Sequence, residues 1–461
     1  MSLSRKIRGD FMSSVPKNSS DVVIVEGVRT PFTKSGTKFK AVHAVQLGQA
    51  ALKELIARTN LNVELVDEVI MGNTGSPSDA VNISRVVALN AGFPIKTSAV
   101  TVHRNCASAL ESITTGYDRI KAGTMDMIVA GGTENMSQMP LIFPPSITSI
   151  IERLGSAKTA GARVSALWDW LKADLTQIKE MVTTPPLVKT KYKPIISLAE
   201  GLTDPFVGMN MGMTAEVIAK EFGISRREQD EYALKSHQKA VVARAKLSEE
   251  ITPIYLPPDY KETITEDNGP RESQTIEALT KLKPFFDKTT GSITAGNSCP
   301  ITDGAAVVLI MSREKADALG YKPIARIRSY GYAGLEPERM GMGPAYSTPI
   351  ALKRAGLSMK EIGLVEINEA FAAQVMANQK AFDSDEFGKK IGLSGKIGEL
   401  RTDILNVNGG AIALGHPVGA TGTRIVLTLM KEMKRRSTEF GLATLCIGGG
   451  QGGSIIIENE G

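Results

Sequence analysis

The chain has 461 residues, of which 42% are hydrophobic and 22% are charged. This ordinary globular composition excludes a disordered, collagen-like or disulfide-scaffold protein, and the length is sufficient for two or three domains. The 54 Lys and Arg residues exceed the 49 Asp and Glu residues by only five. Such an excess is too small to indicate nucleic-acid binding, and would suit a polyanionic small molecule equally well.

Cysteine and histidine usage limits the compartment and the chemistry. The three cysteines are an odd and sparse set, which argues against a disulfide framework and for a reducing compartment, the cytoplasm or, alternatively, the mitochondrial matrix. The four histidines follow no metal-ligand spacing, so no metal site is predicted. No apolar run is long enough to cross a membrane. Residues 1–20 are basic and serine-rich without an apolar centre, and are predicted to be a disordered tail.

Strand-like and helix-like segments alternate from residue 21 onward. The run DVVIVEGVRTPF, residues 21–32, has the Val and Ile density of a strand that is covered on both faces. The apolar run at 65–73, the helical pattern at 107–123 and the apolar run at 125–132 follow it. This order predicts an α/β sheet covered by helices.

The C-terminal part repeats the same order of segments. PIARIRSYGYA matches the opening strand, IGLVEINEA matches LVDEVIMGN, and the helix that begins near residue 419 matches the helix after Cys106. The run ATLCIGGGQGGS then matches DMIVAGGTENMS. We therefore predict a duplication into two similar halves. The expected division is an N-terminal half at 21–137, an inserted loop domain at 138–290, a return to the first half at 291–324, and a C-terminal half at 325–461.

The insertion contains a predicted amphipathic helix at 165–182. Its apolar residues follow one another at alternating spacings of three and four, and they are Trp168, Leu171, Leu175, Ile178 and Val182. A helix with such a stripe must bury it. Packing on the same subunit, a partner surface and a membrane surface all remain open at this point, although the polar face is not basic enough to favour a membrane.

Two residues stand at corresponding places in the two halves. Cys106, in HRNCAS, lies between a predicted strand and a helix, where the positive end of the helix dipole favours a thiolate nucleophile. A buried structural cysteine is the alternative. His416 precedes the matching helix of the second half, in the glycine-rich run NVNGGAIALGHPVGATGTR. If the halves pack about a two-fold axis, the loops of Cys106 and His416 converge.

Two further polar sites follow predicted strands of the second half. Cys446 begins CIGGGQGGS, where successive glycine N–H groups can line an oxyanion and a thiol can move protons. A buried small hydrophobic role is its alternative. Asn368 and Glu369 lie ahead of an apolar helix, and either cap that helix or, through Asn368, hold a water or a carbonyl.

These motifs together resemble the thiolases, which are acyl-CoA acyltransferases, over about residues 22–459. The resemblance rests on NCAS, GGTENMS, MGMTAE, AGNSCPITDGAA, NEAF, the run around His416 and CIGGGQGGS. It implies an α/β thiolase-type duplicated fold, in which two similar mixed-sheet halves with sandwiched helices form αβαβα layers and carry an inserted loop domain. It also implies a 3-ketoacyl-CoA thiolase reaction through an acyl-enzyme on Cys106, with coenzyme A as a substrate and no permanently bound cofactor.

The resemblance also implies a role for each motif residue. Cys106 would accept the acyl group, His416 would activate it and help to bind the thioester oxygen, and Cys446 would be the acid and base. Asn368 would hold the water that completes the first oxyanion hole, and the backbone N–H groups of Cys106 and Gly448 would form the second.

Three residues are expected to contact the substrate. Met211, in MNMG, would approach the thioester, and Arg271, in DNGPRES, is similar to the arginine that lies along the CoA adenine. Cys299 stands where thiolases usually have the serine that touches the pantetheine amide. Because a thiol is a poor donor, CoA orientation would differ there.

The insertions at 138–205 and near 381–403 are similar to those of the β subunit of the trifunctional β-oxidation complex, although that group usually has His where this chain has Asn368. We therefore expect a degradative enzyme with acyl-CoA and CoA as ligands. The expected assembly is a homodimer or homotetramer, with an α subunit left open and no nucleic acid. The alternatives are an acetyl-CoA acetyltransferase that forms acetoacetyl-CoA and, more distantly, a catalytically silent CoA-binding subunit.

Overall fold

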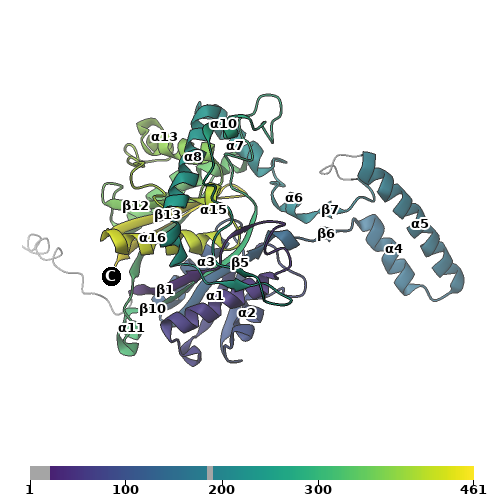
Figure 1. The fold of residues 1–461 in the computed structure, drawn as a ribbon, viewed down its shortest axis with the longest axis horizontal. Coiled ribbons are helices and arrows are strands. Elements are labelled where there is room, and N and C mark those ends of the chain that lie inside the picture. The colour runs from purple at the N-terminus through teal and green to yellow at the C-terminus, as the bar shows by residue number, and fades with distance from the viewer. Residues whose placement is uncertain (1–20, 184–189) are drawn as a thin grey trace, which may run out of the picture.

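The computed structural model describes residues 21–183 and 190–461, so the predicted tail at 1–20 lies outside the described residues. One mixed sheet of ten strands runs through the body of the protein (Figure 1). The strands that form its path are, in spatial order, β12 (Ile362–Ile367), β13 (Phe440–Ile447), β14 (Gln451–Asn459), β11 (Ala325–Gly334), β1 (Val22–Arg29), β10 (Thr302–Ser312), β5 (Met127–Asn135), β3 (Glu68–Gly72) and β4 (Ser98–Val102), and β2 (Thr33–Lys34) pairs with β10.

The sheet is built from two equivalent halves that meet at β1 and β11. Only two residue pairs, Val23 with Arg326 and Ile24 with Ala325, join these strands. On each side of this joint the next two pairings are antiparallel and the third is parallel. β4 then pairs in parallel with β3, and an isolated parallel bridge from Val365 to Leu405 takes the corresponding place in the second half. The predicted duplication is therefore confirmed.

Helices complete the five expected layers. α3 (Ser108–Lys121) and α16 (Thr421–Arg436) lie between the two halves of the sheet, and their apolar side chains share one core with strands from both halves. α1 (Ala44–Thr59) and α2 (Ile83–Ala91) cover the outer face of the first half. α12 (Gly343–Ala355) and α13 (Ala372–Phe382) cover the outer face of the second. The order is αβαβα, as predicted.

The insertion adds short elements that surround one end of this body. Its two longest helices beside the body are α7 (Met211–Glu221) and α8 (Arg226–Val242), which both contact α13. α8 also contacts α15 (Ala411–Leu414). The insertion also contains α6 (Ser197–Gly201), α9 (Arg244–Ser248), β8 (Ile254–Tyr255), β9 (Thr263–Ile264) and α10 (Ile276–Thr280). Outside the insertion, the structure also has α11 (Arg313–Leu319), α14 (Asp385–Lys390) and the 3₁₀ helices at Val63–Leu65, Met136–Gln138 and Pro337–Met342.

A helical hairpin projects away from the body (Figure 1). It stands on the two-residue strands β6 (Leu141–Ile142) and β7 (Ile195–Ile196), and consists of α4 (Pro145–Ser156) and α5 (Ala160–Thr183). α5 turns Ala166 and Ala173 inward, where Ala173 packs on Ile147 and Ile150 of α4.

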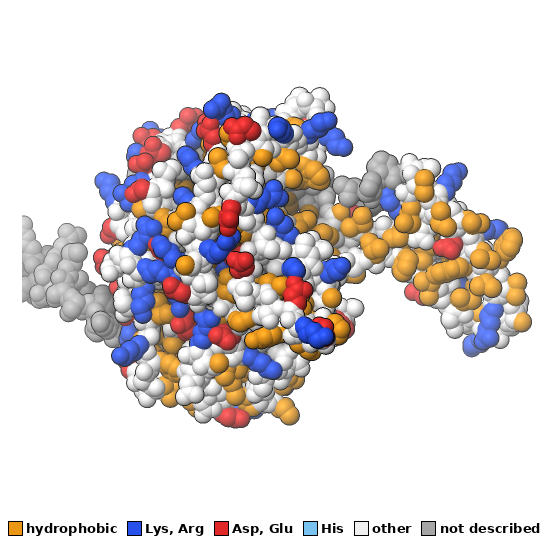
Figure 2. Space-filling model, viewed as in Figure 1, with side chains coloured by type: hydrophobic (Ala, Val, Ile, Leu, Met, Phe, Trp, Pro, Cys, Tyr) orange, Lys and Arg blue, Asp and Glu red, His pale blue; other side chains and the backbone are white. Residues whose placement is uncertain are grey.

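The predicted apolar stripe of α5 lies on its other face. Trp168 is 59% exposed and Leu175 is 71% exposed, and the other three residues of the stripe are exposed as well. Apolar side chains accordingly cover much of the hairpin surface in Figure 2. Of the three possibilities left open by the sequence, packing of the stripe on the same subunit is not what the structure shows, because the small residues of α5, rather than the stripe, face α4. No helix within 21–183 and 190–461 has both the length and the hydrophobicity needed to cross a bilayer.

Glycine allows the two central helices to approach closely. A Cβ at Gly422, in the first turn of α16, would collide with the backbone nitrogen of Leu110 in α3. A Cβ at Gly132 in β5 would likewise collide with the carbonyl oxygen of Gly419. The start of α16 therefore lies directly against the first half, which is what brings His416 towards Cys106.

We expect Gly422→Ala to reduce the free energy of unfolding by about 1–3 kcal/mol, because the backbones of α3 and α16 would have to separate to admit the methyl group. Urea unfolding monitored by far-UV circular dichroism, which reports the loss of secondary structure, measures this change. Gly155→Ala is the matched control, since Gly155 is also helical and a Cβ there meets nothing within 4 Å. Equal stability of the two variants would contradict the proposed close packing.

Candidate active site

Cys106 lies at the sharp turn between β4 and α3. Asn105, the residue before it, has a left-handed backbone with φ of 44°, which turns the chain into the helix. α3 begins at Ser108 without a side-chain cap at Ala107, so the first N–H groups of the helix are not used by a capping side chain. The backbone N–H groups of Cys106 and Gly448 both interact with the Cys106 sulfur.

The resting state of Cys106 differs from the sequence expectation. Burial raises the pKa of the thiol above its ordinary value, and the two backbone N–H groups only partly offset this effect. The helix N-terminus therefore does not by itself produce a thiolate, because the loss of hydration destabilises the thiolate more than the two backbone N–H groups stabilise it. Cys106 needs a neighbouring base if it is to act as a nucleophile.

His416 is a neutral imidazole held between two side chains. It lies in the loop between α15 and α16 and is 6% exposed. Its Nδ1 is 2.6 Å from Thr421 Oγ1, and its Nε2 is 3.5 Å from Asn368 Nδ2. Burial, assisted by the charge of Arg424, lowers the pKa of His416 to about 3. The ring is therefore neutral at rest, with a proton on one of its two nitrogens, and the other nitrogen can accept a proton.

Cys446 is the penultimate residue of β13, and the glycine loop expected from the sequence follows at 448–450. Its side chain is fully buried, and the loop is tied to the Cys106 turn because Asn105 Nδ2 donates to the Gly448 carbonyl at 2.7 Å. Burial raises the pKa of Cys446 well above its ordinary value, and the neighbouring thiols of Cys106 and Cys299 raise it further. Cys446 is therefore a protonated thiol at rest.

Cys299 joins the same cluster of thiols. Its backbone N–H donates to the Ala370 carbonyl at 3.0 Å, and the adjacent Ile301 forms a bridge with His416. Burial and then the nearby Cys106 raise the pKa of Cys299 to about 12. All three cysteines are free. Cys106 affects the pKa of Cys299, and both affect the pKa of Cys446, so the structure brings the three thiols together.

Asn368 and Glu369 do not cap the following helix. α13 begins at Ala372, and its N-cap position, Phe371, forms no side-chain capping bond, so the capping interpretation is wrong. Asn368 instead faces His416, and its Oδ1 has no hydrogen-bond partner among the described residues. The Glu369 carboxylate accepts bonds from the side chains and backbone that surround it, from Tyr232, Ser236, Asn406 and Ile412.

Of the residues predicted to contact the substrate, Met211 lies beside the thiol cluster and Arg271 does not. Met211 begins α7 and packs with Cys446 in one apolar cluster, and its sulfur lies against Gly448. Arg271 lies outside the thiol cluster, on an exposed loop whose Gly269 packs on the Ala413 backbone. Arg271 and Lys34 add to the effect of burial and lower the pKa of His237 to about 4. These residues form a basic group beside α15.

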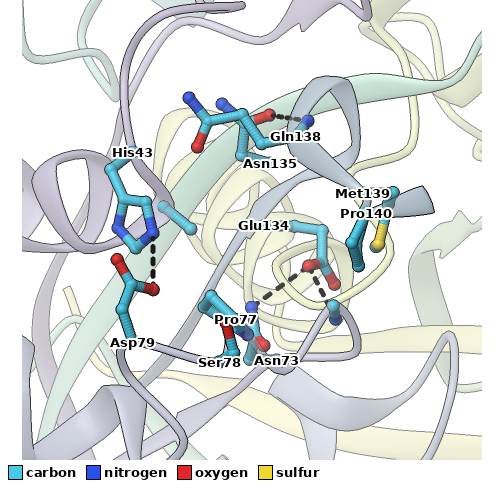
Figure 3. Close-up of a pocket in the computed structure, with 12 residues that line it drawn as sticks. His43, Asn73, Pro77, Ser78, Asp79, Glu134, Asn135, Gln138, Met139 and Pro140 are labelled. Carbon is cyan, nitrogen blue, oxygen red and sulfur yellow. Dashed lines mark hydrogen bonds and ion pairs between the residues drawn. The ribbon is translucent and has the colours of Figure 1, made fainter. Parts of the chain in front are cut away.

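Glu134 is a buried residue that the sequence reasoning did not single out. Its carboxylate accepts hydrogen bonds from the backbone N–H groups of Thr74, Gly75 and Gly419, and Figure 3 shows it beside Asn73. It thereby links the first half to the start of α16. A cavity of about 300 Å³ lies beside it, bordered by an ion pair between His43 and Asp79, and none of the predicted catalytic residues lines this cavity. The available signal was a single charged residue in the buried strand MIVAGGTEN.

Thr421 is the second residue that was missed. Its hydroxyl contacts the ring of His416 from the first turn of α16. The signal was a hydroxyl side chain five residues after the histidine, which a helix start folds back towards the loop. Across 21–183 and 190–461, no group of three or more His, Cys, Asp and Glu residues is arranged to hold a metal ion.

Comparison with known proteins agrees with this geometry. The family description "Thiolase, N-terminal domain" matches residues 22–314, and "Thiolase, C-terminal domain" matches residues 321–459. A relative from Yersinia pestis (strain Pestoides F), named 3-ketoacyl-CoA thiolase, is 37% identical over 450 residues, which cover 97% of this chain and 98% of the relative.

Two solved structures are similar over nearly the whole chain. Human mitochondrial 3-ketoacyl-CoA thiolase aligns with a TM-score of 0.81 and 36% identity over 96% of this chain and 99% of that one. Acetyl-CoA acetyltransferase from Bacillus anthracis aligns with a TM-score of 0.79 and 35% identity over 95% and 98%. The chain belongs to the thiolase family of acyltransferases.

Proposed function

We propose that this protein is a 3-ketoacyl-CoA thiolase, which cleaves a 3-ketoacyl-CoA with free CoA to give acetyl-CoA and a shortened acyl-CoA. The observation that supports this reaction best is the cluster of the thiols of Cys106, Cys299 and Cys446, with two backbone N–H groups at the Cys106 sulfur. His416 is joined to this cluster through its backbone contacts with Pro300 and Ile301, which directly follow Cys299. A nucleophile, a neutral base and a separate protonated thiol are the three groups that a reversible carbon–carbon cleavage through an acyl-enzyme needs. The name of the Yersinia relative is consistent with this substrate.

In the first half-reaction, His416 Nε2 takes the proton of the Cys106 thiol as the sulfur attacks the 3-keto carbon. The C2–C3 bond then breaks, and its electron pair passes to C2 of the departing acetyl-CoA enolate. Cys446 gives its proton to C2, which releases acetyl-CoA and leaves a Cys446 thiolate. The high pKa of Cys446 fits this order, because its first task is to donate a proton.

In the second half-reaction, the Cys446 thiolate takes the proton of the incoming CoA thiol. The CoA sulfur attacks the acyl group on Cys106, and the departing Cys106 thiolate recovers its proton from His416. The N–H groups of Cys106 and Gly448 stabilise one oxyanion, and His416 with a water held by Asn368 stabilises the other. Every group returns to its starting protonation state.

Three residues would position the substrate. Met211 would contact the thioester, since it already packs between Cys446 and Gly448. Cys299 would face the pantetheine chain as a neutral thiol, because its pKa of about 12 excludes a charged form at neutral pH. Arg271, with Lys34 nearby, would attract the phosphates of CoA. A structure of the human neighbour in complex with CoA aligns with a TM-score of 0.80, which supports a CoA site here.

Two alternatives differ in what the same residues achieve. An acetyl-CoA acetyltransferase that forms acetoacetyl-CoA would use the same groups, and the Bacillus neighbour bears that name. A silent CoA-binding subunit would not need a neutral base beside Cys106, so the burial of His416 against Asn368 and Thr421 favours an active enzyme. A cytoplasmic location and a homodimer or homotetramer remain predictions.

Variants of Cys106 and Cys446 should distinguish acylation of the enzyme from proton transfer to carbon. Cys106→Ser should abolish acyl-enzyme formation from acetyl-CoA, because a serine hydroxyl is far more difficult to deprotonate. Cys446→Ala should still acylate Cys106 detectably but should lose condensation and thiolysis, since carbon protonation needs the second thiol. Intact-protein mass spectrometry measures the acyl group, and a thiolysis assay measures turnover. Substantial thiolysis in Cys106→Ser, or equal loss of both steps in Cys446→Ala, would refute these assignments.

The pH dependence of the free enzyme follows from the two pKa directions. Because the pKa of Cys106 is raised, its thiolate fraction at pH 7 is below that of a free cysteine and grows about tenfold per pH unit. Its alkylation by iodoacetamide should therefore rise continuously from pH 6 to pH 9, with no inflection from His416, whose pKa is about 3. Peptide mass spectrometry resolves the modified cysteine, and glutathione serves as the reference thiol. A plateau that begins below pH 7 would contradict this state.

We also propose that another protein covers the exposed face of α5. The polar positions of the helix contain as many acidic as basic side chains, Asp169, Asp174 and Glu180 against Arg163, Lys172 and Lys179. An anionic lipid surface favours a basic polar face, so a protein surface is the better match. Exposed Trp168 is of the type that dominates such interfaces. An α subunit of a β-oxidation complex is the candidate that the sequence resemblance implies.

Replacement of both Trp168 and Leu175 by Asp should leave thermal stability and thiolysis unchanged, because these side chains lie on the solvent face of α5 and far from the thiols. The same variant should lose a partner that co-purifies with the full chain. Ala173→Asp is the control, since Ala173 packs on α4 and its substitution should lower stability. Loss of folding in the double variant, or retention of the partner, would count against an interface.

A further inference from the structure

The ring of His416 can exist as either of two neutral tautomers, and its neighbours decide between them. Thr421 Oγ1 lies 2.6 Å from Nδ1 and 3.0 Å from the carbonyl oxygen of Pro417. A carbonyl oxygen only accepts, so the single hydroxyl proton is donated to Pro417. Oγ1 must then accept from the ring, which places the imidazole proton on Nδ1.

The other side of the ring agrees with this assignment. Asn368 Nδ2 is an N–H donor and lies 3.5 Å from Nε2, so Nε2 is the acceptor of that contact. The opposite tautomer would need Thr421 to donate to Nδ1, which would give up the bond to Pro417, and would need the Asn368 amide to turn over. The arrangement with the proton on Nδ1 therefore makes one more hydrogen bond in a fully buried site.

On the basis of the proposed thiolase reaction, we propose that Thr421 is a positioning residue that fixes His416 as the Nδ1–H tautomer. Nε2 then carries no proton, accepts only the long contact from Asn368, and can take the proton of Cys106. It becomes a hydrogen-bond donor only when it holds that proton. The proton that leaves Cys106 thus becomes the Nε2–H group that donates to the thioester oxygen. His416 therefore cannot stabilise an oxyanion before Cys106 has been deprotonated.

This order follows from the balance of protons. In the resting site the Cys106 sulfur and His416 Nδ1 each carry one proton, and Nε2 carries none. Transfer of the Cys106 proton to Nε2 leaves a thiolate and an imidazolium, which Thr421 Oγ1 continues to accept from at Nδ1. Removal of the Thr421 hydroxyl leaves Nδ1–H buried without an acceptor, and this favours the tautomer whose Nε2 cannot act as a base.

The test compares Thr421→Val with Thr421→Ser and with Thr423→Val. Thr423 is a matched control, because it is also buried in the first turn of α16 and its hydroxyl donates to the Ala109 carbonyl at 3.1 Å, away from His416. We expect Thr421→Val to lower kcat for thiolysis roughly 10- to 100-fold with little change in KM, the scale of a misplaced general base. Thr421→Ser should recover most of kcat, and Thr423→Val should lose stability but not kcat.

A spectroscopic measurement separates positioning from a general structural effect. In protein labelled with ¹⁵N-histidine, the protonated and bare ring nitrogens resonate far apart, and His416→Gln identifies the His416 signals. The wild type should show the proton on Nδ1, and Thr421→Val, or Thr421→Ala if the valine variant does not fold, should show it shifted to Nε2 or averaged. An Nε2–H tautomer in the wild type, or equal losses of kcat in Thr421→Val and Thr423→Val, would overturn the proposal. Absence of thiolysis in the wild type would instead refute the proposed function. The ¹⁵N spectrum would still test the tautomer of His416, because it does not depend on activity.

Discussion

The structure depends on the contact between α3 and α16 at the centre of the molecule. Gly422 lets the two helices touch through their backbones, and Gly132 admits the Gly419 carbonyl against β5. Each helix begins beside a residue of the active site, Cys106 for α3 and His416 for α16. A methyl group at this contact would move both loops apart, so the same constraint that closes the core also sets how closely the loops of Cys106 and His416 approach each other.

Burial at this junction determines the protonation state of the site. It keeps Cys106 and Cys446 as thiols and His416 as a neutral ring, so the resting site carries no separated charges among its reacting groups. A thiolate and an imidazolium formed together attract each other strongly in such a low-dielectric setting. Activation of the nucleophile is therefore expected when substrate supplies an electrophilic carbon, rather than in the free enzyme.

The duplicated fold could be predicted from sequence, because each half repeats the same strands. The position of Cys106 and His416 in the loops that precede α3 and α16 could be predicted as well, because glycine-rich and short turns mark these loops. The state of Cys106 could not, since local position at a helix end does not report how much protein surrounds the sulfur. The capping interpretation of Asn368 failed for a similar reason. The helix begins four residues later, and the loop turns the amide towards His416. The stripe on α5 was recognised, but periodicity does not tell which face of a helix meets its neighbour. Small residues such as Ala173 allowed the opposite face to pack.

The proposed site draws on both halves of one framework. The first half contributes Cys106, and the second contributes His416, Asn368 and Cys446, so neither half contains the whole proposed set. The Asn105 amide binds the Gly448 carbonyl and Glu134 binds the Gly419 amide, which places polar ties between the halves at both sides of the reacting groups. Among the residues that the structure describes, the hairpin of α4 and α5 joins this body through β6, β7 and the adjoining loops. A partner bound to α5 would therefore leave the contact between α3 and α16 undisturbed, and recognition and catalysis can change independently in this chain.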